Sequence, residues 1–364
     1  MGGALDRPVQ SIGSAPQQCV ILVGGLGTRL GALTGGAPKP LTAVAGRPFL
    51  SYLVWHARRM GFSRVLLLAG HRGEHVLGYR DQLNRDVGLH VEVAIEPEPL
   101  GTAGALRFAS RQLEPRFLLL NGDSLFDFNW LNLVTSGGPD VDAVMAVRRA
   151  TDASRFGVVE LDGERVTRFR ERGDTTGGLI NGGVYVLTQA LALACPVKGS
   201  LEQDVLPSLA AAGRVKASEQ TGFFLDIGVP EALAKAQEQI PASLTRGARF
   251  FSLEDLVEPQ SEGSPARLRT GSIAAVRAAN DSGRFAFMQV GSLKAAAGWL
   301  ETTYASIQTN LRDHGAHLDD LLLLQQPEKV GPEQQGLLSL GDQLARWPID
   351  AADCVRHRTD VAHP

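Results

Sequence analysis

The sequence predicts an α/β protein with a mostly parallel sheet in its main domain and a second, smaller α/β domain. Short apolar runs alternate with amphipathic stretches from residue 19 onward, which is typical of strands joined by crossover helices. Two runs, residues 19–23 and 117–120, are apolar throughout, as expected of central strands covered on both faces. The chain of 364 residues is long enough for two domains.

The elements follow in a regular order. Residues 1–17 are rich in Gly, Ser, Pro and Gln without periodicity, so we expect a flexible leader. The first domain then runs over residues 18–245. Its first strands and helices are expected, in chain order, at residues 19–23, 49–60, 65–69, 74–83, 90–95, 103–113 and 117–120.

The pattern changes beyond residue 143. Strand-like runs at 143–148, 157–161, 166–170 and 183–187 are separated by turn residues such as Asp162-Gly163. We expect these strands to be more antiparallel and to cover the open end of the first sheet. The pattern breaks near residues 241–247, so the second domain is predicted over residues 246–364.

The composition excludes several classes of protein. Hydrophobic residues make up 44% and charged residues 21%, which is ordinary for a globular chain. The net charge of −3 and the lack of a basic block exclude nucleic acid as an expected partner. Three widely spaced cysteines fit a reducing cytoplasm, and no run approaches the ~18 apolar residues of a membrane span. We therefore expect a cytoplasmic protein that is not bound to a membrane.

A glycine-rich loop directly follows the first strand. It reads Val23-Gly24-Gly25-Leu26-Gly27-Thr28-Arg29-Leu30, and Pro38-Lys39-Pro40-Leu41 comes shortly after it. Glycines let backbone N–H groups approach a phosphate, while Arg29 and Lys39 bring two cations to the same mouth of the sheet. The loop is neither a Walker A loop nor a G-x-G-x-x-G loop. It predicts triphosphate binding, and a flexible strand-to-helix connection is the alternative.

Two aspartates stand after separate apolar runs. Asp123 follows residues 117–120, and Asp226 follows Phe223-Phe224-Leu225. Carboxylate oxygens at two strand ends suit Mg²⁺, so we predict that both aspartates reach one cleft and hold this cofactor. A turn residue is the alternative for Asp123 alone, and the pairing with Asp226 favours the metal site.

The loop with Pro-Lys-Pro-Leu resembles the nucleotidyltransferases that join a nucleoside triphosphate to a sugar 1-phosphate. The resemblance covers about residues 18–240. Further motifs match in order at residues 98–106, 121–123, 156–158, 169–172, 181–185, 200–204 and 224–231. It implies a Rossmann-like, GT-A-like fold and in-line attack of a sugar phosphate oxygen on the α-phosphorus, with loss of pyrophosphate.

The resemblance also implies roles for individual residues. Arg29 would contact the departing phosphates and Lys39 the α-phosphate, while Asp123 and Asp226 would be catalytic through Mg²⁺. The nucleotide-binding residues would be Gly24, Gly25, Gly27, Thr28, Gly101 and Thr102. The sugar-binding residues would be Gly157, Glu171, Arg172, Asn181 and Glu202. Arg172 stands where the family usually has lysine, which changes the geometry available to the sugar phosphate.

Residues 246–364 carry fainter traces of a haloacid-dehalogenase-type phosphatase. Ser252 stands where the first motif, F-L-D-x-D-G-V, has its nucleophilic aspartate, and Glu254 stands at its acid/base aspartate. Serine cannot form the acyl phosphate, so we expect a degenerate, truncated domain without phosphatase activity. An unrelated α/β domain is the alternative. Leucines at 318, 321–324, 337, 338 and 340 are expected to bury against the first domain or a second copy.

The resemblance favours one substrate pair. Residues 22–29, 47–50 and 69–72 are similar to the branch that acts on heptose 1-phosphate with GTP, and the phosphatase remnant fits a heptose pathway for cell-surface polysaccharide. The expected reaction gives a nucleotide sugar and pyrophosphate from an NTP and a sugar 1-phosphate. Alternatives are mannose or glucose 1-phosphate with another NTP, and a non-catalytic regulatory subunit that binds a nucleotide sugar. A homo-oligomer and a monomer both stay open.

Overall fold

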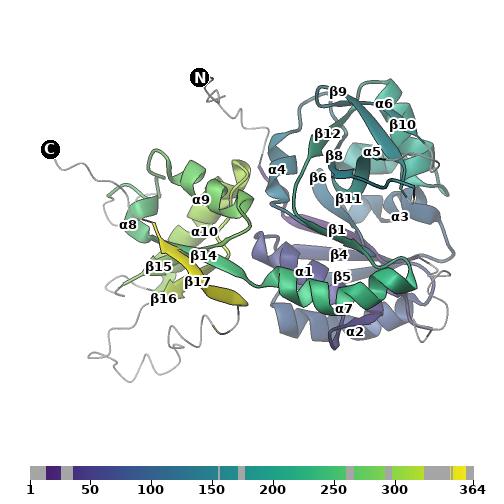
Figure 1. Ribbon diagram of the computed structural model, residues 1–364. Coiled ribbons are helices and arrows are strands. Elements are labelled where there is room, and N and C mark those ends of the chain that lie inside the picture. The colour runs from purple at the N-terminus through teal and green to yellow at the C-terminus, as the bar shows by residue number, and fades with distance from the viewer. Residues whose placement is uncertain are drawn as a thin grey trace.

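The computed structural model describes residues 14–25, 36–154, 156–170, 177–259, 266–291, 297–323, 345 and 347–357. Two modules, each built around its own sheet, lie side by side (Figure 1). Helix α7 (Pro230–Leu244) runs along the larger module and leads directly into β14 (Arg246–Ser252) of the smaller one. The smaller module, residues 246–357, is called the C-terminal module below.

The larger module contains a nine-stranded sheet in the order β5-β4-β1-β6-β11-β8-β12-β10-β9. The strands are β1 (Gln18–Leu22), β4 (Arg64–Ala69), β5 (His90–Ile95), β6 (Arg116–Asn121), β8 (Ala143–Ala150), β9 (Val158–Asp162), β10 (Arg165–Arg170), β11 (Gly178–Thr188) and β12 (Val215–Glu219). Strand β1 is parallel to both β4 and β6, while β11 is antiparallel to β6 and β8. The parallel strands predicted from the sequence are therefore present in the first half of the sheet, and its second half is mixed.

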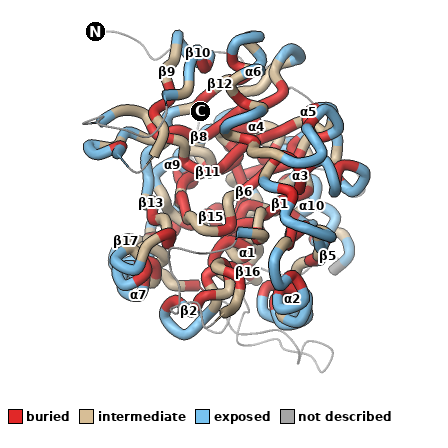
Figure 2. The backbone as a smooth tube through the Cα atoms, turned by 90° about the vertical axis from the view of Figure 1, so that its right-hand side faces the viewer, coloured by how far each residue is buried: buried red, intermediate tan, exposed pale blue. Residues whose placement is uncertain are grey.

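Helices cover both faces of this sheet (Figures 1 and 2). Besides α7, they are α1 (Phe49–Arg59), α2 (Gly73–Val87), α3 (Gly101–Ala109), α4 (Leu131–Thr135), α5 (Gln189–Ala194) and α6 (Leu206–Ala211). The larger module also contains the short helical turns η2 (Lys39–Leu41), η3 (Ser110–Gln112) and η4 (Leu201–Val205), and the small strand pair β2 (Ala43–Val44) and β3 (Arg47–Pro48). Ile21 and Leu118 belong to one core, whereas Val20 and Leu119 belong to the core on the opposite face. Two-sided burial explains why these strands are apolar throughout.

The strands after residue 143 extend the first sheet from its free edge at β6, and most of their pairings are antiparallel, as predicted. Strand β11 pairs with β6 along one edge and with β8 along the other. Strand β12 then pairs in parallel with β8, and β10 and β9 complete the same sheet. The long strand β11 therefore joins both halves into one layer, because each of its edges is used.

A separate two-stranded ribbon packs on this sheet. Strand β7 (Ser124–Asp127) pairs antiparallel with β13 (Phe223–Asp226), so that Asp226 lies opposite Ser124 and Phe223 opposite Asp127. The rings of Phe126 and Phe224 contact each other edge to face at 5.6 Å. This β7–β13 ribbon carries both predicted metal ligands at one of its ends.

The C-terminal module has a four-stranded parallel sheet in the order β16-β15-β14-β17. Its further elements are α8 (Leu253–Leu256), α9 (Ser272–Asp281), β15 (Phe285–Val290), α10 (Ala297–Asp313), β16 (Asp320–Leu323) and β17 (Ile349–Arg356). Leu318 is buried in a core made by this module alone, so its expected burial against the larger module was wrong. Leu322 belongs to a cluster that also includes Trp55 of α1 in the larger module, as expected. Residues 324, 337, 338 and 340 lie outside the described part of the chain.

Residues just before the first strand contact the C-terminal module. Ala15 is buried, and its N–H donates to the Asp313 carboxylate at 2.6 Å. Pro16 accepts a hydrogen bond from Arg312 at its carbonyl oxygen. Residues 15 and 16, within the expected leader, thus connect the start of the larger module to α10. None of the helices in the described part of the chain is long and apolar enough to cross a membrane.

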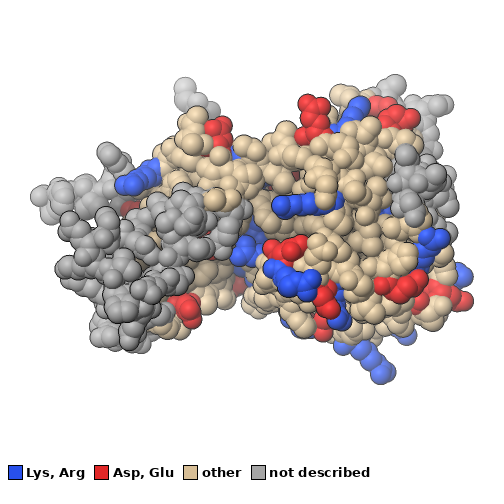
Figure 3. All heavy atoms as spheres, turned by 90° about the horizontal axis from the view of Figure 1, so that it is seen from below, with Lys and Arg blue, Asp and Glu red and all other residues tan. Residues whose placement is uncertain are grey.

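Charges are mixed on the face shown in Figure 3. Lysine and arginine side chains alternate with aspartate and glutamate over the larger module. This face therefore lacks a continuous basic surface of the kind that follows a nucleic-acid backbone.

Candidate active site

Lys39 and Asp123 form an ion pair at the carboxyl ends of parallel strands. Lys39 Nζ lies 2.7 Å from Asp123 Oδ2, with the lysine side chain 11% exposed and the aspartate 40%. Asp123 follows β6 after a tight turn in which Gly122 N–H donates to Leu22 O. A Cβ atom at Gly122 would lie 2.2 Å from that oxygen, so only glycine fits. The turn places Asp123 where open α/β sheets bind ligands.

Asp226 reaches the same place from the ribbon. It ends β13 opposite Ser124, and the following Ile227 N–H donates to the carbonyl oxygen of Asp123 at 2.9 Å. A Cβ atom built on Gly228 would lie 2.5 Å from Asp226 Oδ1 and 3.2 Å from Lys39 Nζ. The structure thus brings Lys39, Asp123 and Asp226 together, although they are far apart in the sequence.

The donor set of this site suits Mg²⁺. Two carboxylates converge here, and the described residues contain no group of three or more His, Cys, Asp or Glu that could hold a metal ion. Mg²⁺ commonly takes one or two protein carboxylates and completes its shell with water and substrate phosphates. The residues therefore fit a magnesium ion bound together with a triphosphate, and they do not match a structural zinc site.

The start of the glycine-rich loop also lies at this edge of the sheet. Val23, the residue after β1, donates its N–H to Leu68 O of β4, and Gly24 and Gly25 follow it. A Cβ atom at Gly24 would lie 2.9 Å from Gly70 N, so the close approach of two backbones requires glycine here. Gly27, Thr28 and Arg29 lie outside the described residues.

Glu96 is a candidate residue that the sequence analysis missed. Its Oε2 accepts a hydrogen bond from Leu100 N at 2.8 Å. Its Oε1 faces the glycines, since it lies 3.3 Å from a Cβ atom built on Gly24. Burial raises the pKa of Glu96, and the Leu100 N–H opposes this rise. The only signal in the sequence was its place just before the motif at residues 98–106.

Residues predicted for the nucleotide and for the sugar share one hydrogen-bond network. Thr102 Oγ1 donates to Glu202 Oε2 at 2.9 Å and accepts from Leu201 N. Asn181 Nδ2 donates to the Tyr185 hydroxyl at 2.6 Å, and this hydroxyl lies 3.5 Å from Glu202 Oε1. Burial and the Glu202 carboxylate hold the pKa of Tyr185 well above its ordinary value, and Asp123 contributes in the same direction. Tyr185 therefore acts as a neutral hydrogen-bonding group beside the Asp123 site.

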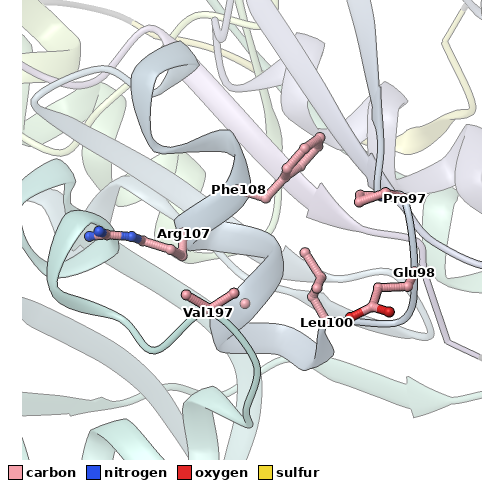
Figure 4. Close-up of a pocket in the computed structure, with 7 residues that line it drawn as sticks. Pro97, Glu98, Leu100, Arg107, Phe108 and Val197 are labelled. Carbon is pink, nitrogen blue, oxygen red and sulfur yellow. The ribbon is translucent and has the colours of Figure 1, made fainter.

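Gly101 has a packing role of its own. Its φ of +76° lies in the left-handed region, and a Cβ atom there would be 2.4 Å from the carbonyl oxygen of Gly199. The start of α3 thus packs directly on the loop before η4. A groove beside α3 contains no predicted site residue (Figure 4). It is lined by Pro97, Glu98, Leu100, Gly104, Arg107, Phe108 and Val197.

The sugar side is described in part. Ile180 pairs with Val158, so Gly157 lies next to the start of the Asn181 segment. The Arg148 guanidinium lies 4.7 Å from the centre of the Phe224 ring, two residues before Asp226. Burial lowers the pKa of Arg148, and no carboxylate among the described residues pairs with it. Glu171 and Arg172 lie outside the described residues.

This mixed sheet, whose carboxyl edge brings together Lys39 of η2, Asp123 after β6 and Asp226 of the ribbon, is typical of α/β proteins that bind nucleotide phosphates. A family model described as nucleotidyl transferase matches residues 18–243, and the protein belongs to this family. The match ends just before β14, so the C-terminal module lies beyond it.

Two similar proteins are named as guanylyltransferases that act on a sugar 1-phosphate. The D-glycero-alpha-D-manno-heptose 1-phosphate guanylyltransferase of Aneurinibacillus thermoaerophilus is 33% identical over 227 residues, covering 61% of this chain and 98% of that protein. The probable mannose-1-phosphate guanylyltransferase 1 of Oryza sativa is 31% identical, covering 64% of this chain and 70% of that protein. The crystal structure of HddC from Yersinia pseudotuberculosis complexed with GMP-PN has a TM-score of 0.56 and 33% identity, covering 61% of this chain and 99% of that chain.

Proposed function

We propose that this protein transfers a guanylyl group from GTP to a sugar 1-phosphate, with heptose 1-phosphate as the sugar substrate, and releases pyrophosphate. The convergence of Lys39, Asp123 and Asp226 at the carboxyl ends of β1 and β6 carries this proposal. The names of the relatives support the choice of GTP and heptose. The product would be an activated sugar of the kind used in the cytoplasm for cell-surface polysaccharides.

The chemistry needs charge neutralisation more than proton transfer. The attacking sugar phosphate oxygen is already anionic, so no side chain has to remove a proton from it. Mg²⁺ held by Asp123 and Asp226 would neutralise charge on the triphosphate. Lys39, which is paired with Asp123, would bring its ammonium group to the α-phosphate, and Arg29 would bind the departing pyrophosphate.

The nucleotide would occupy the loop of Gly24, Gly25, Gly27 and Thr28 and the start of α3 at Gly101 and Thr102. Glu96 offers a carboxylate to the base beside this loop. Guanine presents N–H donors at N1 and N2, which a carboxylate accepts well. Adenine lacks the N1 proton, so Glu96 favours GTP.

Replacing Glu96 by glutamine is expected to raise KM for GTP about tenfold with little change in kcat. The carboxylate of Glu96 would accept charge-assisted hydrogen bonds from guanine, whereas the amide of glutamine offers one neutral acceptor and one donor. Initial rates of pyrophosphate release with GTP and with ATP measure the effect. Glu98→Gln is the matched control, since Glu98 lines the outer groove instead. An unchanged KM for GTP in the Glu96 variant would remove this residue from base recognition.

The sugar 1-phosphate would lie against Gly157, Glu171, Arg172, Asn181 and Glu202. Tyr185 orients the last two through its hydroxyl group. Arg148 adds a half-buried positive charge close to Asp226, which suits the phosphate of the sugar. Mannose 1-phosphate is the second candidate substrate, because the rice relative is named for it.

The direct test measures pyrophosphate release from a panel of nucleoside triphosphates and sugar 1-phosphates, with and without Mg²⁺. We expect Mg²⁺-dependent release that is highest with GTP and heptose 1-phosphate. Highest release with mannose 1-phosphate would select the second candidate. No release from any pair would contradict an enzymatic role and leave a regulatory subunit that binds nucleotide sugars, which equilibrium dialysis with GDP-sugars detects.

We also propose that the C-terminal module is a degenerate phosphatase-like domain without phosphatase activity. Its strand order supports this, since β14 is central, β15 and β16 follow on one side, and β17 lies on the other. Ser252 Oγ accepts from Asp255 N at 3.1 Å, and Asp255 Oδ2 accepts from Ser252 N, so the serine caps α8. Metal-dependent phosphate release from a sugar bisphosphate would contradict the proposal.

A further inference from the structure

The far end of the β7–β13 ribbon is held by buried charges. Asp127, whose side chain is 7% exposed, ends β7 and forms an ion pair with Arg246 of β14. Arg59 Nη1 of α1 lies 3.6 Å from the same carboxylate. Asp127 is thus held by the start of the C-terminal module and by α1.

The same arginine connects Asp127 to the C-terminal sheet. Arg59 Nε donates to Asp319 Oδ1 at 2.6 Å. Asp319 Oδ2 in turn accepts from Ala286 N of β15 at 2.7 Å. A continuous chain of charge-assisted contacts therefore runs from β7 through Arg59 and Asp319 to β15.

The charges in this cluster balance. It contains the two arginines and two aspartates just named. Burial lowers the pKa of the adjoining His56 to about 3 and also lowers that of His317, whose Nε2 lies 3.6 Å from Asp319 Oδ1, so both histidines are neutral. Removing one member would leave an uncompensated buried charge. The remaining members would have to move towards water or towards other partners, and Asp127 would move with them.

A second group of contacts holds the residues just after β7. Asn129 Nδ2 donates to Gly315 O at 2.7 Å and to Asp281 Oδ1 at 3.0 Å. Asn132 of α4 accepts from Arg277 of α9. The C-terminal module therefore contacts the chain on both sides of the point where the ribbon ends.

The opposite end of the ribbon carries the proposed metal ligands. Asp127 and Asp226 lie at opposite ends of a strand pair only four residues long, or about 10 Å. Phe126 and Leu225 are buried between these ends. A short, packed ribbon of fixed register transmits a displacement of one end to the other.

We propose that Asp319 of the C-terminal module is a positioning residue for the metal site: through Arg59 and Asp127 it fixes the β7–β13 ribbon, so that Asp123 and Asp226 stay correctly placed for Mg²⁺. This inference rests on the proposed function. It gives the C-terminal module a role that needs no phosphatase chemistry.

The test uses Asp319→Asn in the full chain. The half-saturating Mg²⁺ concentration for pyrophosphate release is expected to rise roughly fivefold. The dissociation constant of Mn²⁺ in the presence of GTP, followed by the electron paramagnetic resonance signal of free Mn²⁺, should rise by the same factor. Asp319→Glu keeps the charge, so both of these values should stay closer to those of the unsubstituted protein.

Val276→Ala is the control for a merely structural role. Val276 is buried in the core of the C-terminal module and is not part of the charge cluster. This variant should lower the midpoint of thermal unfolding without changing the Mn²⁺ dissociation constant. If Asp319→Asn behaves in the same way, the inference is overturned. Should Asp319→Asn fail to fold, Arg59→Lys, which keeps the charge but loses the paired geometry, is judged by the same two constants.

The outcomes separate this inference from the function on which it rests. An unsubstituted protein that neither releases pyrophosphate nor binds Mn²⁺ with GTP contradicts the proposed function as well. An unsubstituted protein that does both, with unchanged metal constants in the Asp319 and Arg59 variants, contradicts only the positioning role.

Discussion

Asp123→Ala is expected to lower kcat for pyrophosphate release by about 10²-fold or more. The substitution removes one of the two carboxylates at the proposed metal site and the partner of Lys39, which lies 2.7 Å away. The triphosphate charge would then be poorly neutralised, and the ammonium group would lose its fixed position. Rates measured over a range of Mg²⁺ concentrations should also show a weaker dependence on the metal.

Asp226→Ala is expected to have a similar effect, because both carboxylates would hold the same ion. The double variant should be little worse than either single variant, since groups that act as a unit are not additive. Asp162→Ala, at an exposed turn of the same module, is the control and should keep ordinary rates. Unchanged rates in the Asp123 and Asp226 variants would rule out the metal assignment.

The sequence predicts well those parts of the fold that appear as a pattern of consecutive residues. Residues 19–23 and 117–120 are apolar throughout because Val20 and Ile21 face two different cores. The convergence of Asp123 and Asp226 followed from a similar argument, since each comes shortly after a strand-like run whose end lies at the ligand-binding edge of the sheet, whereas Lys39 was predicted there from its place after the glycine-rich loop.

Contacts that depend on strand pairing could not be predicted in this way. The link between Asn181 and Tyr185 needs the irregularity in β11 at this point, and the position of Glu96 needs the approach of Gly24 to Gly70. Neither has a periodic signal in the sequence. The position of Arg148 over Phe224 likewise depends on the placement of the ribbon.

The junction between the modules shows the same limit. Leucine-rich residues predicted an apolar contact, and Leu322 belongs to a cluster that includes Trp55 of the larger module, whereas Leu318 faces a core of its own module. The contact also includes buried ion pairs such as that of Arg59 with Asp319, which are 260 positions apart. A single arginine has no sequence feature that identifies such a distant partner, so the charge cluster emerged only from the structure.

Deleting residues 248–364 is expected to destabilise the larger module by ~3–5 kcal/mol, which lowers its midpoint of thermal unfolding by roughly 10 °C. The deletion removes Asp319 and leaves Asp127 as the carboxylate that Arg59 and Arg246 share. Trp55 of α1 also loses its ring contacts with Phe285 and Trp347, at 6.3 Å and 5.8 Å. Scanning calorimetry of the purified truncated chain measures the change.

Pyrophosphate release should nevertheless persist after this deletion. Lys39, Asp123 and Asp226 all precede residue 248, and the family match ends at residue 243. The Mg²⁺ requirement should rise as in Asp319→Asn, because the ribbon loses the same anchor. Trp347→Ala removes the ring contacts with Trp55, Phe285 and Phe287 but keeps the charge cluster, so it should lower the midpoint less and leave the Mg²⁺ requirement unchanged. A truncated protein that unfolds at the full-length temperature would show that the junction adds no stability. A folded truncated protein with no pyrophosphate release would show that the C-terminal module contributes directly to the active site.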